Sequence, residues 1–441
     1  MGAGRVDRAA PAASAYERIR VSPTRSGRRQ TVARHGRLRS PHPVAQFFKL
    51  VAVSLAVVLV AGIGIVGYNV WSLTTNLTQD AVALEGQSAV PPDIGAIEGG
   101  VNLFLAGTDA CEPEYAALFG DRCSGADAEG DLNDVNLLLH ISDNPRRVTV
   151  ISFPRDLMIP IPSCTRPDGS TTSAMSKQQL NSTFSYGGLS CAVKTISELT
   201  GQNIPFAASV TFGGVIQITD AIGGVDVCIA NGIRDPYTGI DWPAGTRNVQ
   251  GWDALQFLRT RHGVGNGGDL GRISNQQQYM SRLARKLVGE GVLSDPATLY
   301  KLATVGVENV TPSQSLTNPM TLVQIALAVK EVPFNEIVFV QYPTLTDPAD
   351  PNRVVPNKNA ADTLFAALEA NQQLVLTGST SQGDGTIVAD PTQAPTDPTA
   401  PTPTQSADPA QPTTPTDSVA LPSSIAGQTA AEETCSNGNL R

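Results

Sequence analysis

A run of apolar residues near the amino end is the feature that most constrains this 441-residue chain. From Leu50 to Trp71 the sequence reads LVAVSLAVVLVAGIGIVGYNVW, and its only ionisable side chain is that of Tyr68. A helix over these 22 residues would extend about 33 Å, and the hydrocarbon core of a bilayer is about 30 Å thick. A cleaved signal peptide would have a shorter apolar stretch and would rarely begin this far along the chain. We therefore expect residues 50–71 to form a retained transmembrane helix.

Charge is distributed unevenly around this segment. Residues 1–49 carry eleven basic and two acidic side chains, although the whole chain has a formal net charge of -9. Because basic residues mark the cytoplasmic side of a span, we expect this arm in the cytoplasm and everything after Trp71 outside the cell membrane. The arm could instead bind nucleic acid, but we interpret it as an arm that fixes membrane orientation, and we expect no nucleic-acid partner.

All six cysteines follow the apolar segment, which fits an exported, oxidising environment. No two have the CxxC spacing of a zinc ribbon. Cys111 and Cys123 bracket one polar loop, and Cys164 and Cys191 bracket the next. We expect these two pairs to form disulfides, on loop position alone, with other pairings left open.

Composition divides the exported part into a stalk at 72–98, a folded domain at 99–371 and a tail at 372–441. The tail has no aromatic residue, and eight of its residues between Pro391 and Pro415 are proline. Such a segment buries too little apolar surface to offset the entropy of ordering it. We therefore expect a disordered tail, and we expect its removal beyond about residue 375 to leave the chemistry intact.

Apolar patterning in the folded domain alternates between the periods of strands and helices. A turn signal at Asp143-Asn144-Pro145 joins two predicted strands into a hairpin. Alternating strands and helices predict an α/β layered domain. Strands are predicted at 101–107, 135–141 and 148–153, and helices at about 190–200, 213–221, 250–259 and 270–288.

Charged residues stand where the hairpin strands begin and end. Arg155 and Asp156 follow the second strand, and Asp134 precedes the first. Because α/β sheets bind ligands beyond the carboxyl ends of strands, we expect Asp134 and Asp156 to approach each other and to suit a hard cation such as Mg²⁺. Taken singly, each residue is more simply explained as an ion pair or a solvated aspartate at a turn.

Further candidates lie at the junction of two helices. Arg259 and Arg261 follow one helix, and Asp269, Arg272 and Gln276 open the next. Guanidinium groups bind phosphate oxygens bidentately, and Arg272 and Gln276 share a helix face. The alternative is ordinary helix ends, with cations at a carboxyl end and Asp269 as an N-cap. Since the chain has no Walker loop, GxSxG elbow or HExxH motif, phosphate chemistry is its best interpretation.

The order of these motifs resembles the LytR–CpsA–Psr family of bacterial cell-envelope proteins. The resemblance implies an α/β/α fold around a central mixed sheet. It also implies a Mg²⁺-dependent, single-span membrane phosphotransferase that moves a glycopolymer from a polyprenyl-pyrophosphate carrier to peptidoglycan through a phosphodiester bond. The matching segments are VNLFLAGTD (101–109), SFPRD (152–156), LNSTFSYGG (180–188), TISELTG (195–201), DAIGGVDV (220–227), the RTRH turn (259–262) and GDLGRISNQQQ (268–278), together with the strand of Asp134.

The same resemblance implies a role for each candidate, and all of them except Gln276 are implied to be catalytic. Gln276 corresponds to a head-group contact. The others correspond to metal-associated carboxylates (Asp134, Asp156), an acidic position needed for activity (Asp269) and pyrophosphate-binding arginines (Arg155, Arg259, Arg261, Arg272).

The chain departs from the family pattern in three ways. Asn133 and Val135 flank Asp134 where hydroxyl residues are usual. Gln179 stands where Lys is common, and Lys177, two residues away, is a substitute that the sequence leaves open. An insertion containing Cys111 and Cys123 enlarges the loop before Asp134.

Two other functions stay open on the sequence alone. A hydrolase would cleave the same pyrophosphate with water, and no motif separates water from a sugar hydroxyl as the nucleophile. A non-catalytic envelope-binding or regulatory protein would keep the fold, although a binder has no need of paired metal carboxylates. The sequence does not identify the polymer, whether teichoic acid, arabinogalactan-like or capsular.

Overall fold

The computed structural model describes residues 100–119, 131–289, 295–389 and 418–440, together with residue 123 and short stretches before residue 100 (44, 47–49, 51–57, 60, 61, 75 and 78–87). The chain divides into two compact units, Met1–Ile65 and Val66–Arg441. In the first unit, residues 47–49, 51–57, 60 and 61 are helical, while most of the basic arm and the rest of the apolar segment 50–71 lie outside the described residues. No helix within the described ranges is both long and apolar enough to cross a membrane.

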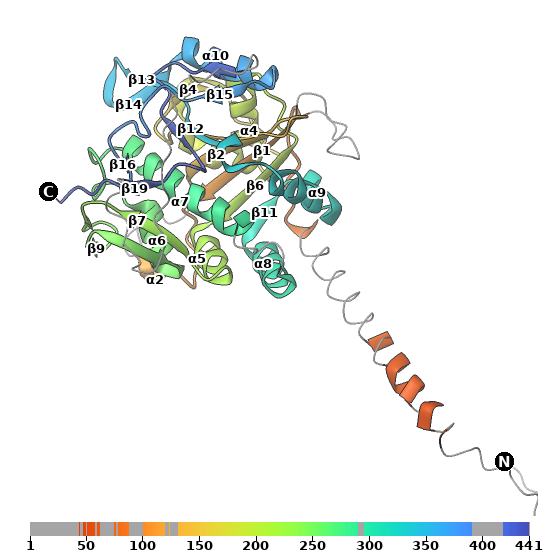
Figure 1. Cartoon of the computed structure of the whole chain (residues 1–441). Helices are drawn as coiled ribbons and strands as arrows, with labels where there is room; N and C mark the ends of the chain where they lie inside the picture. Colours follow the sequence, from red (N-terminus) through yellow and green to blue (C-terminus); the bar gives the residue numbers. More distant parts are fainter. Residues whose placement is uncertain are drawn as a thin grey trace, which may run out of the picture. The chain divides into compact units, whose positions relative to one another are not determined.

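A seven-stranded mixed sheet runs through the second unit (Figure 1). The strand order is β11-β6-β1-β2-β3-β12-β18, with β1–β6 and β3–β12 parallel and the other neighbours antiparallel. The predicted hairpin is confirmed, since β2 and β3 pair across the Asp143–Pro145 turn. The strands are β1 (Val101–Thr108), β2 (Asn133–Ile141), β3 (Val148–Ser152), β6 (Phe206–Thr211), β11 (Val310–Pro312), β12 (Ile337–Gln341) and β18 (Gly427–Thr429).

Both faces of this sheet are buried, because successive residues of a strand point to opposite sides. Phe104 and Leu138 pack on one face, against α4 (Thr183–Thr200) and α10 (Lys358–Glu369). Leu103 and Leu137 pack on the other face, against α7 (Asp269–Gly289) and α9 (Pro319–Lys330). Figure 1 shows these helices on the two sides of the sheet. The domain is therefore an α/β fold with a central mixed sheet, as the sequence predicted.

The four helices expected from the sequence are all present. Those predicted at 213–221 and 250–259 are α5 (Phe212–Ala221) and α6 (Gly251–Arg259), and that at 270–288 is α7. The one predicted at 190–200 is the carboxyl-terminal part of α4, in which Gly187 and Gly188 have non-helical torsion angles. The other helices are α2 (Ala116–Phe119) and α8 (Pro296–Asn309), with 3-10 turns η2 (Leu180–Ser182), η4 (Gln314–Leu316) and η5 (Phe334–Glu336).

Smaller sheets and hairpins surround the central sheet. A four-stranded sheet has the order β10-β7-β19-β16, and four further pairs of strands lie apart from it. Its strands are β7 (Val225–Ile229), β10 (Gly245–Val249), β16 (Thr386–Val388) and β19 (Thr434–Ser436). The pairs are β4 (Met158–Ile161) with β5 (Met175–Gln179), β8 (Ile233–Asp235) with β9 (Ile240–Trp242), β13 (Thr344–Asp347) with β14 (Asp350–Pro356), and β15 (Gln373–Val375) with β17 (Ser418–Ala420).

Much of the segment assigned to a tail belongs to the fold, which corrects the boundary expected at residue 371. Strand β18 completes one edge of the central sheet, and Ile425 and Ala430 are fully buried in its two cores. Cys435 forms a disulfide with Cys228, a pairing the sequence left open. The proline-rich stretch between Pro391 and Pro415 lies outside the described residues.

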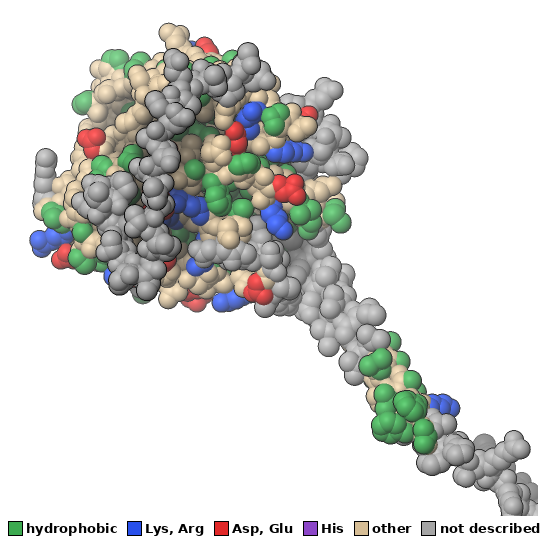
Figure 2. Space-filling model, in the orientation of Figure 1, with side chains coloured by type: hydrophobic (Ala, Val, Ile, Leu, Met, Phe, Trp, Pro, Cys, Tyr) green, Lys and Arg blue, Asp and Glu red, His purple; other side chains and the backbone are tan. Residues whose placement is uncertain are grey.

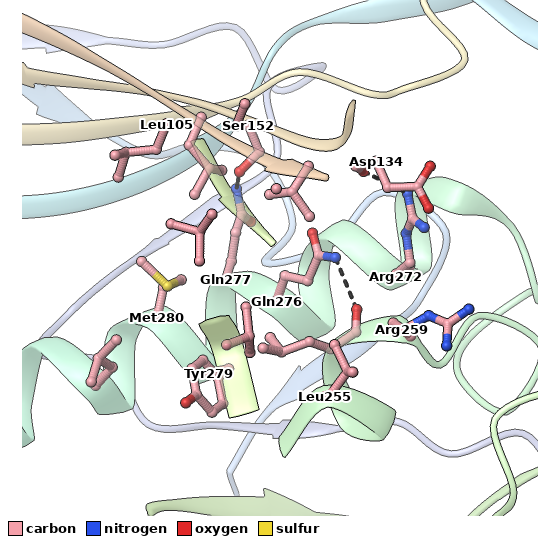
Figure 3. Close-up of a pocket in the computed structure, with 18 of the residues that line it drawn as sticks. Leu105, Asp134, Ser152, Leu255, Arg259, Arg272, Gln276, Gln277, Tyr279 and Met280 are labelled. Atoms are coloured by element: carbon pink, nitrogen blue, oxygen red, sulfur yellow. Dashed lines mark hydrogen bonds between the residues drawn. The ribbon is translucent and has the colours of Figure 1, made fainter. Parts of the chain in front are cut away.

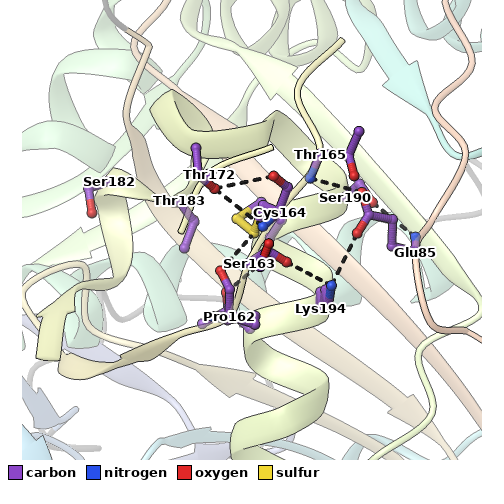
Figure 4. The surroundings of a disulfide bond; sticks show 12 residues. Glu85, Pro162, Ser163, Cys164, Thr165, Thr172, Ser182, Thr183, Ser190 and Lys194 are labelled. Carbon is purple, nitrogen blue, oxygen red and sulfur yellow. Dashed lines mark hydrogen bonds and ion pairs between the residues drawn. A yellow bond between two sulfur atoms is a disulfide. The ribbon is translucent and has the colours of Figure 1, made fainter. Parts of the chain in front are cut away.

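The two disulfides expected from the sequence, Cys111–Cys123 and Cys164–Cys191, are present. Beside the second one, part of the predicted stalk packs on the domain (Figure 4). The backbone N–H of Glu85 donates to Ser190 Oγ at 3.0 Å, and its carboxylate lies 3.1 Å from Lys194 Nζ. Glu85 is thus held against α4, whereas most of the remaining stalk lies outside the described residues.

Candidate functional site

The central sheet brings Asp134 and the segment after β3 to one edge. Because β2 is antiparallel to both β1 and β3, its first residues lie beside the carboxyl ends of its two neighbours. Asp134 stands at this start, and Pro154 ends the β3 ladder immediately before Arg155 and Asp156. The predicted approach of Asp134 to the residues after β3 follows from this pairing.

The guanidinium of Arg155 is the centre of this edge. Its Nη1 donates to Asp134 Oδ1 at 2.9 Å, and its Nε lies 3.6 Å from Asp269 Oδ1 and 3.8 Å from Asp156 Oδ2. Arg272, in the first turn of α7, places Nη2 2.6 Å from Asp269 Oδ1 and donates to the carbonyl of Asp134 at 3.1 Å. These three carboxylates and two guanidiniums form one cluster, called the carboxylate–arginine cluster below.

Burial and charge act in opposite directions on this cluster. Burial raises the pKa of Asp134, but the guanidiniums of Arg272 and Arg155 outweigh it and hold this pKa below its ordinary value. Burial lowers the pKa of Arg155, but Asp134 and Asp269 outweigh it and hold this pKa above its ordinary value. Both Asp134 and Arg155 are therefore charged at neutral pH.

The carboxylate–arginine cluster also has unsatisfied hydrogen-bonding atoms. In the part of the chain that the structure describes, Asp269 Oδ2 and the Nε atoms of Arg155 and Arg272 are buried without a hydrogen-bond partner. Leaving such groups unpaired costs about 1–3 kcal/mol each. A polar ligand that supplied acceptors to the two Nε atoms would recover part of this cost.

Arg259, in the last turn of α6, is held by aromatic rings. Its guanidinium carbon lies 4.9 Å from the ring centre of Phe212 and 5.3 Å from that of Phe119, within the range of cation–π attraction. Phe119 belongs to the insertion closed by the Cys111–Cys123 disulfide. Burial lowers the pKa of Arg259. Among the described residues no carboxylate lies within ion-pair distance of it, so its charge is available to an anion.

A cavity of about 310 Å³ adjoins the cluster (Figure 3). It lies between the sheet face of β1–β3 and helices α5, α6 and α7, and Figure 3 places Asp134, Arg259 and Arg272 at one end. Basic and apolar side chains also lie beside each other where the surface drawn in Figure 2 is hollowed. The rest of the cavity is mostly apolar, lined among others by Leu105, Leu137, Val150, Ile218, Tyr279, Met280, Leu283 and Phe339.

Residues 70–372 match the model of the LytR_cpsA_psr family. The chain belongs to the LytR–CpsA–Psr family. The cell wall biosynthesis protein LcpA of Corynebacterium glutamicum is 29% identical over 287 residues, covering 59% of this chain and 53% of that protein. The polyisoprenyl-teichoic acid–peptidoglycan teichoic acid transferase TagU of Enterococcus faecalis is 24% identical over 185 residues, covering 42% of this chain and 57% of that protein. The chain thus spans little more than half the length of these two relatives.

One solved structure is similar to part of this chain. The LytR-Csp2A-Psr enzyme from Actinomyces oris is 22% identical, with a TM-score of 0.48, over 66% of this chain and 95% of that one.

Seven of the eight candidate residues of this LytR–CpsA–Psr chain lie together. Five form the carboxylate–arginine cluster, and Arg259 and Gln276 line the adjoining cavity. Arg261 differs, because its Nε donates to the carbonyl of Gly267 at 3.2 Å and it forms no ion pair with the other candidates among the described residues. The catalytic and binding roles of all eight stay predictions.

Sequence reasoning missed Asp235, which shapes the RTRH turn. Its Oδ2 accepts hydrogen bonds from Thr260 Oγ1 and from the backbone N–H groups of Arg261, His262 and Gly263. Burial raises the pKa of Asp235, but these hydrogen bonds outweigh it and lower this pKa overall. No local motif signals this role, because Asp235 is distant in sequence from the turn it holds.

Asp156 has two partners that the motifs did not assign to it. Its Oδ1 accepts from Gln179 Nε2 at 3.0 Å and from Arg353 Nη1 at 2.5 Å. Gln179 therefore reaches the cluster, whereas Lys177 pairs with Asp347 at 2.7 Å and does not take its place.

Asp109 is a further acidic residue near the site. It follows the carboxyl end of β1, and its Oδ1 accepts from the backbone N–H of Leu132 at 2.8 Å, two residues before Asp134. Its negative charge acts to raise the pKa of Arg259. An acidic residue directly after a buried strand is the same signal that identified Asp156, and it was available in the sequence.

The chemistry of the cluster fits a hard cation. Asp134 and Asp156 pair with the same guanidinium, that of Arg155, and carboxylate oxygens are the ligands that Mg²⁺ prefers. The lowered pKa of Asp134 keeps it ionised. Within the described ranges, no group of three or more His, Cys, Asp or Glu side chains is arranged to hold a metal ion.

Proposed function

We propose that this protein is a phosphotransferase that moves a glycopolymer from a polyprenyl-pyrophosphate carrier onto peptidoglycan and joins the two through a phosphodiester bond. The observation that carries the proposal is the cavity of Figure 3, whose apolar lining leads to a group of arginines. A prenyl pyrophosphate has two matching parts, an apolar chain and a compact anion. Membership of the family and the transferase activity for which the TagU relative is named support extending the reaction to this chain.

The arginines would act on the pyrophosphate. The acceptor hydroxyl attacks the phosphorus that carries the sugar and loses its proton to water, a new P–O bond forms, and the prenyl phosphate leaves with the electrons of the broken P–O bond. Negative charge on the phosphate oxygens is then stabilised by Arg155, Arg259 and Arg272, which are already held in place. Loss of one preorganised donor of this kind typically lowers the rate by roughly 10²–10³.

The carboxylates would orient these donors before the carrier binds. Asp134 and Asp269 hold Arg155 and Arg272, and the unpaired Nε atoms of both arginines would gain phosphate acceptors. Asp134 and Asp156 would hold Mg²⁺, which supplies positive charge to the pyrophosphate when bound. Gln276 would contact the head group from the face of α7 that carries Arg272.

The membrane would bring the donor to the site. A span at residues 50–71 with a cytoplasmic amino end would keep the domain at the outer surface, where a lipid-linked polymer is also confined. The domain would then meet its donor at a far higher local concentration than in free solution.

Reconstituted transfer tests this proposal against its two alternatives. We would incubate the full chain with a labelled lipid-linked polymer and Mg²⁺, with and without peptidoglycan, and identify the bond in the product. The proposal requires label on peptidoglycan through a phosphodiester. Free polymer released at the same rate without peptidoglycan would establish a hydrolase, and retention of intact donor without any product would establish a binding protein. An Arg155→Gln variant should lose the reaction, and the exposed Arg247→Gln variant should keep it.

A further inference from the structure

The hairpin β13–β14 places an additional arginine on the carboxylate–arginine cluster. Arg353 Nη1 lies 2.5 Å from Asp156 Oδ1, although almost two hundred residues separate the two in sequence. The hairpin is docked at this point, because Val354 bridges to Leu157 and its backbone N–H donates to the carbonyl of Asp156 at 3.4 Å. Lys177 of β5 holds the other strand of the hairpin through Asp347.

The contacts of Asp156 are divided between its two oxygens. Oδ1 accepts from Arg353 and from Gln179, whereas Oδ2 is only loosely paired with Arg155 Nε at 3.8 Å. Asp156 is 7% exposed, so its charge needs compensation by protein groups rather than by water. Most of that compensation comes from Arg353, because Gln179 is neutral and Arg155 is shared with Asp134 and Asp269.

Arg155 is therefore incompletely paired on the side that faces Asp156. Its Nη1 is bonded to Asp134, but its buried Nε has no hydrogen-bond acceptor among the described residues. Without Arg353, Asp156 would lose its strongest partner, and the adjacent Arg155 is the cation that could replace it. Arg155 would then have less capacity to bind an incoming anion.

We propose that Arg353 is a positioning residue of the phosphate site: it neutralises Asp156 and so leaves the Nε–H of Arg155 for an oxygen of the donor pyrophosphate. This inference rests on the proposed function of the cluster as a pyrophosphate site. It makes the β13–β14 hairpin part of the site, although no motif in the sequence marked that segment.

A binding measurement separates this inference from the proposed function. The probe is geranyl pyrophosphate, titrated by calorimetry into the full chain in detergent, with donor KM and kcat measured in parallel. In Arg353→Gln we expect the Kd to rise about tenfold and KM to rise more than kcat falls, with the melting temperature changed by less than about 3 °C. Arg353→Lys keeps the charge but loses the planar fork, so its Kd should lie between those of wild type and Arg353→Gln.

Rescue by a second residue that bonds to the same oxygen of Asp156 is the decisive experiment. Gln179 Nε2 lies 3.0 Å from the same oxygen, and a lysine side chain is long enough to bring an ammonium to it. Gln179→Lys added to Arg353→Gln should therefore restore the Kd to within about threefold of wild type. Lys177→Gln is the matched control, since it loosens the hairpin without touching Asp156 and should leave the Kd unchanged.

Each outcome has one meaning for the inference. An unchanged Kd in Arg353→Gln overturns it. An equal loss in Lys177→Gln without rescue by Gln179→Lys also overturns it, since the hairpin would then act only as structural support. If wild type itself failed to bind geranyl pyrophosphate, the proposed function would fall first, and the inference with it.

Discussion

Arginines in this site are held by two different means. Arg155 and Arg272 are fixed by carboxylates, which keeps them charged but shares their donors with protein acceptors. Arg259 is fixed by two aromatic rings, which orient the guanidinium plane and use none of its N–H donors. Arg259 is therefore the arginine whose shape should matter most for an anionic ligand.

For Arg259→Lys we expect transfer to fall by about tenfold or more, equal to roughly 1.4 kcal/mol in the barrier. The ammonium keeps the charge but loses the planar fork and its contact with the rings of Phe119 and Phe212. The melting temperature should change little. Arg247→Lys is the control, because Arg247 also stacks on a ring, Trp242, at 4.4 Å but is exposed and outside the cavity. Equal rates in wild type and Arg259→Lys would contradict the phosphate-binding role.

His140 makes a separate prediction about pH. It is 3% exposed on β2, its Nδ1 lies 2.8 Å from Asn102 Oδ1, and burial lowers its pKa from 6.5 to about 4. In the unfolded chain His140 therefore binds a proton below about pH 6.5, whereas in the folded chain it binds one only below about pH 4. Stability from this group is complete above pH 6.5 and is lost as the pH falls toward 4, by at most about 3 kcal/mol.

Urea unfolding across this pH range checks the role of His140. His140→Gln should flatten the fall in unfolding free energy between pH 6.5 and 4, whereas His262→Gln, at an exposed histidine, should not. The same slope in wild type and His140→Gln would show that other groups carry the acid response.

Helices and strands with a local sequence pattern could be predicted, whereas strands stabilised by distant partners could not. The β2–β3 hairpin and helices α5–α7 were predictable, because their apolar periods and turn residues lie within short windows. Strands β18 and β19 were not, since GQT and TCS have no apolar alternation and gain their stability from β12, β16 and the Cys228–Cys435 disulfide. The proline-rich, aromatic-free composition of the segment led us to predict a disordered tail, so these short strands were not predicted.

The role of the C-terminal strands is tested by their covalent link. Removing both cysteines in Cys228→Ser/Cys435→Ser releases a long loop, and losing such a disulfide typically costs about 2–5 kcal/mol. We expect the melting temperature to fall by about 5 °C or more. Truncation before Ser418 should destabilise the domain further, because it also removes buried Leu421, Ile425 and Ala430.

Deleting residues 399–409, inside the proline-rich stretch, is the control for both changes and should leave the melting temperature unchanged. A truncated chain with wild-type stability would restore the earlier expectation that everything beyond about 375 is dispensable.

The whole molecule encloses its cavity between layers, which explains why the sequence did not reveal it. Leu105, Val150 and Phe339 line the cavity and alternate along their strands like any core residue, so their pattern does not separate a cavity wall from a packed core. The charged end of the cavity was easier to predict from the sequence. One arginine or aspartate at the end of a helix or strand is explained by capping or an ion pair, but several together indicate a binding site. Arg353 and Asp235 escaped because their partners lie in distant segments.

Because the cavity joins the sheet to α5, α6 and α7, a ligand that fills it should stabilise the whole domain. At one hundred times its Kd, a ligand that binds only the folded state adds about 2.7 kcal/mol. We expect geranyl pyrophosphate to raise the melting temperature more than geraniol or inorganic pyrophosphate at equal concentration, since only the first occupies both ends of the cavity.

Met280→Trp should abolish the contribution of the prenyl chain and keep the response to pyrophosphate, because Met280 lines the apolar end. Leu327→Trp, on the exposed face of α9, is the matched control. Equal shifts with geranyl pyrophosphate and inorganic pyrophosphate in wild type would mean that the apolar cavity takes no part in binding the carrier.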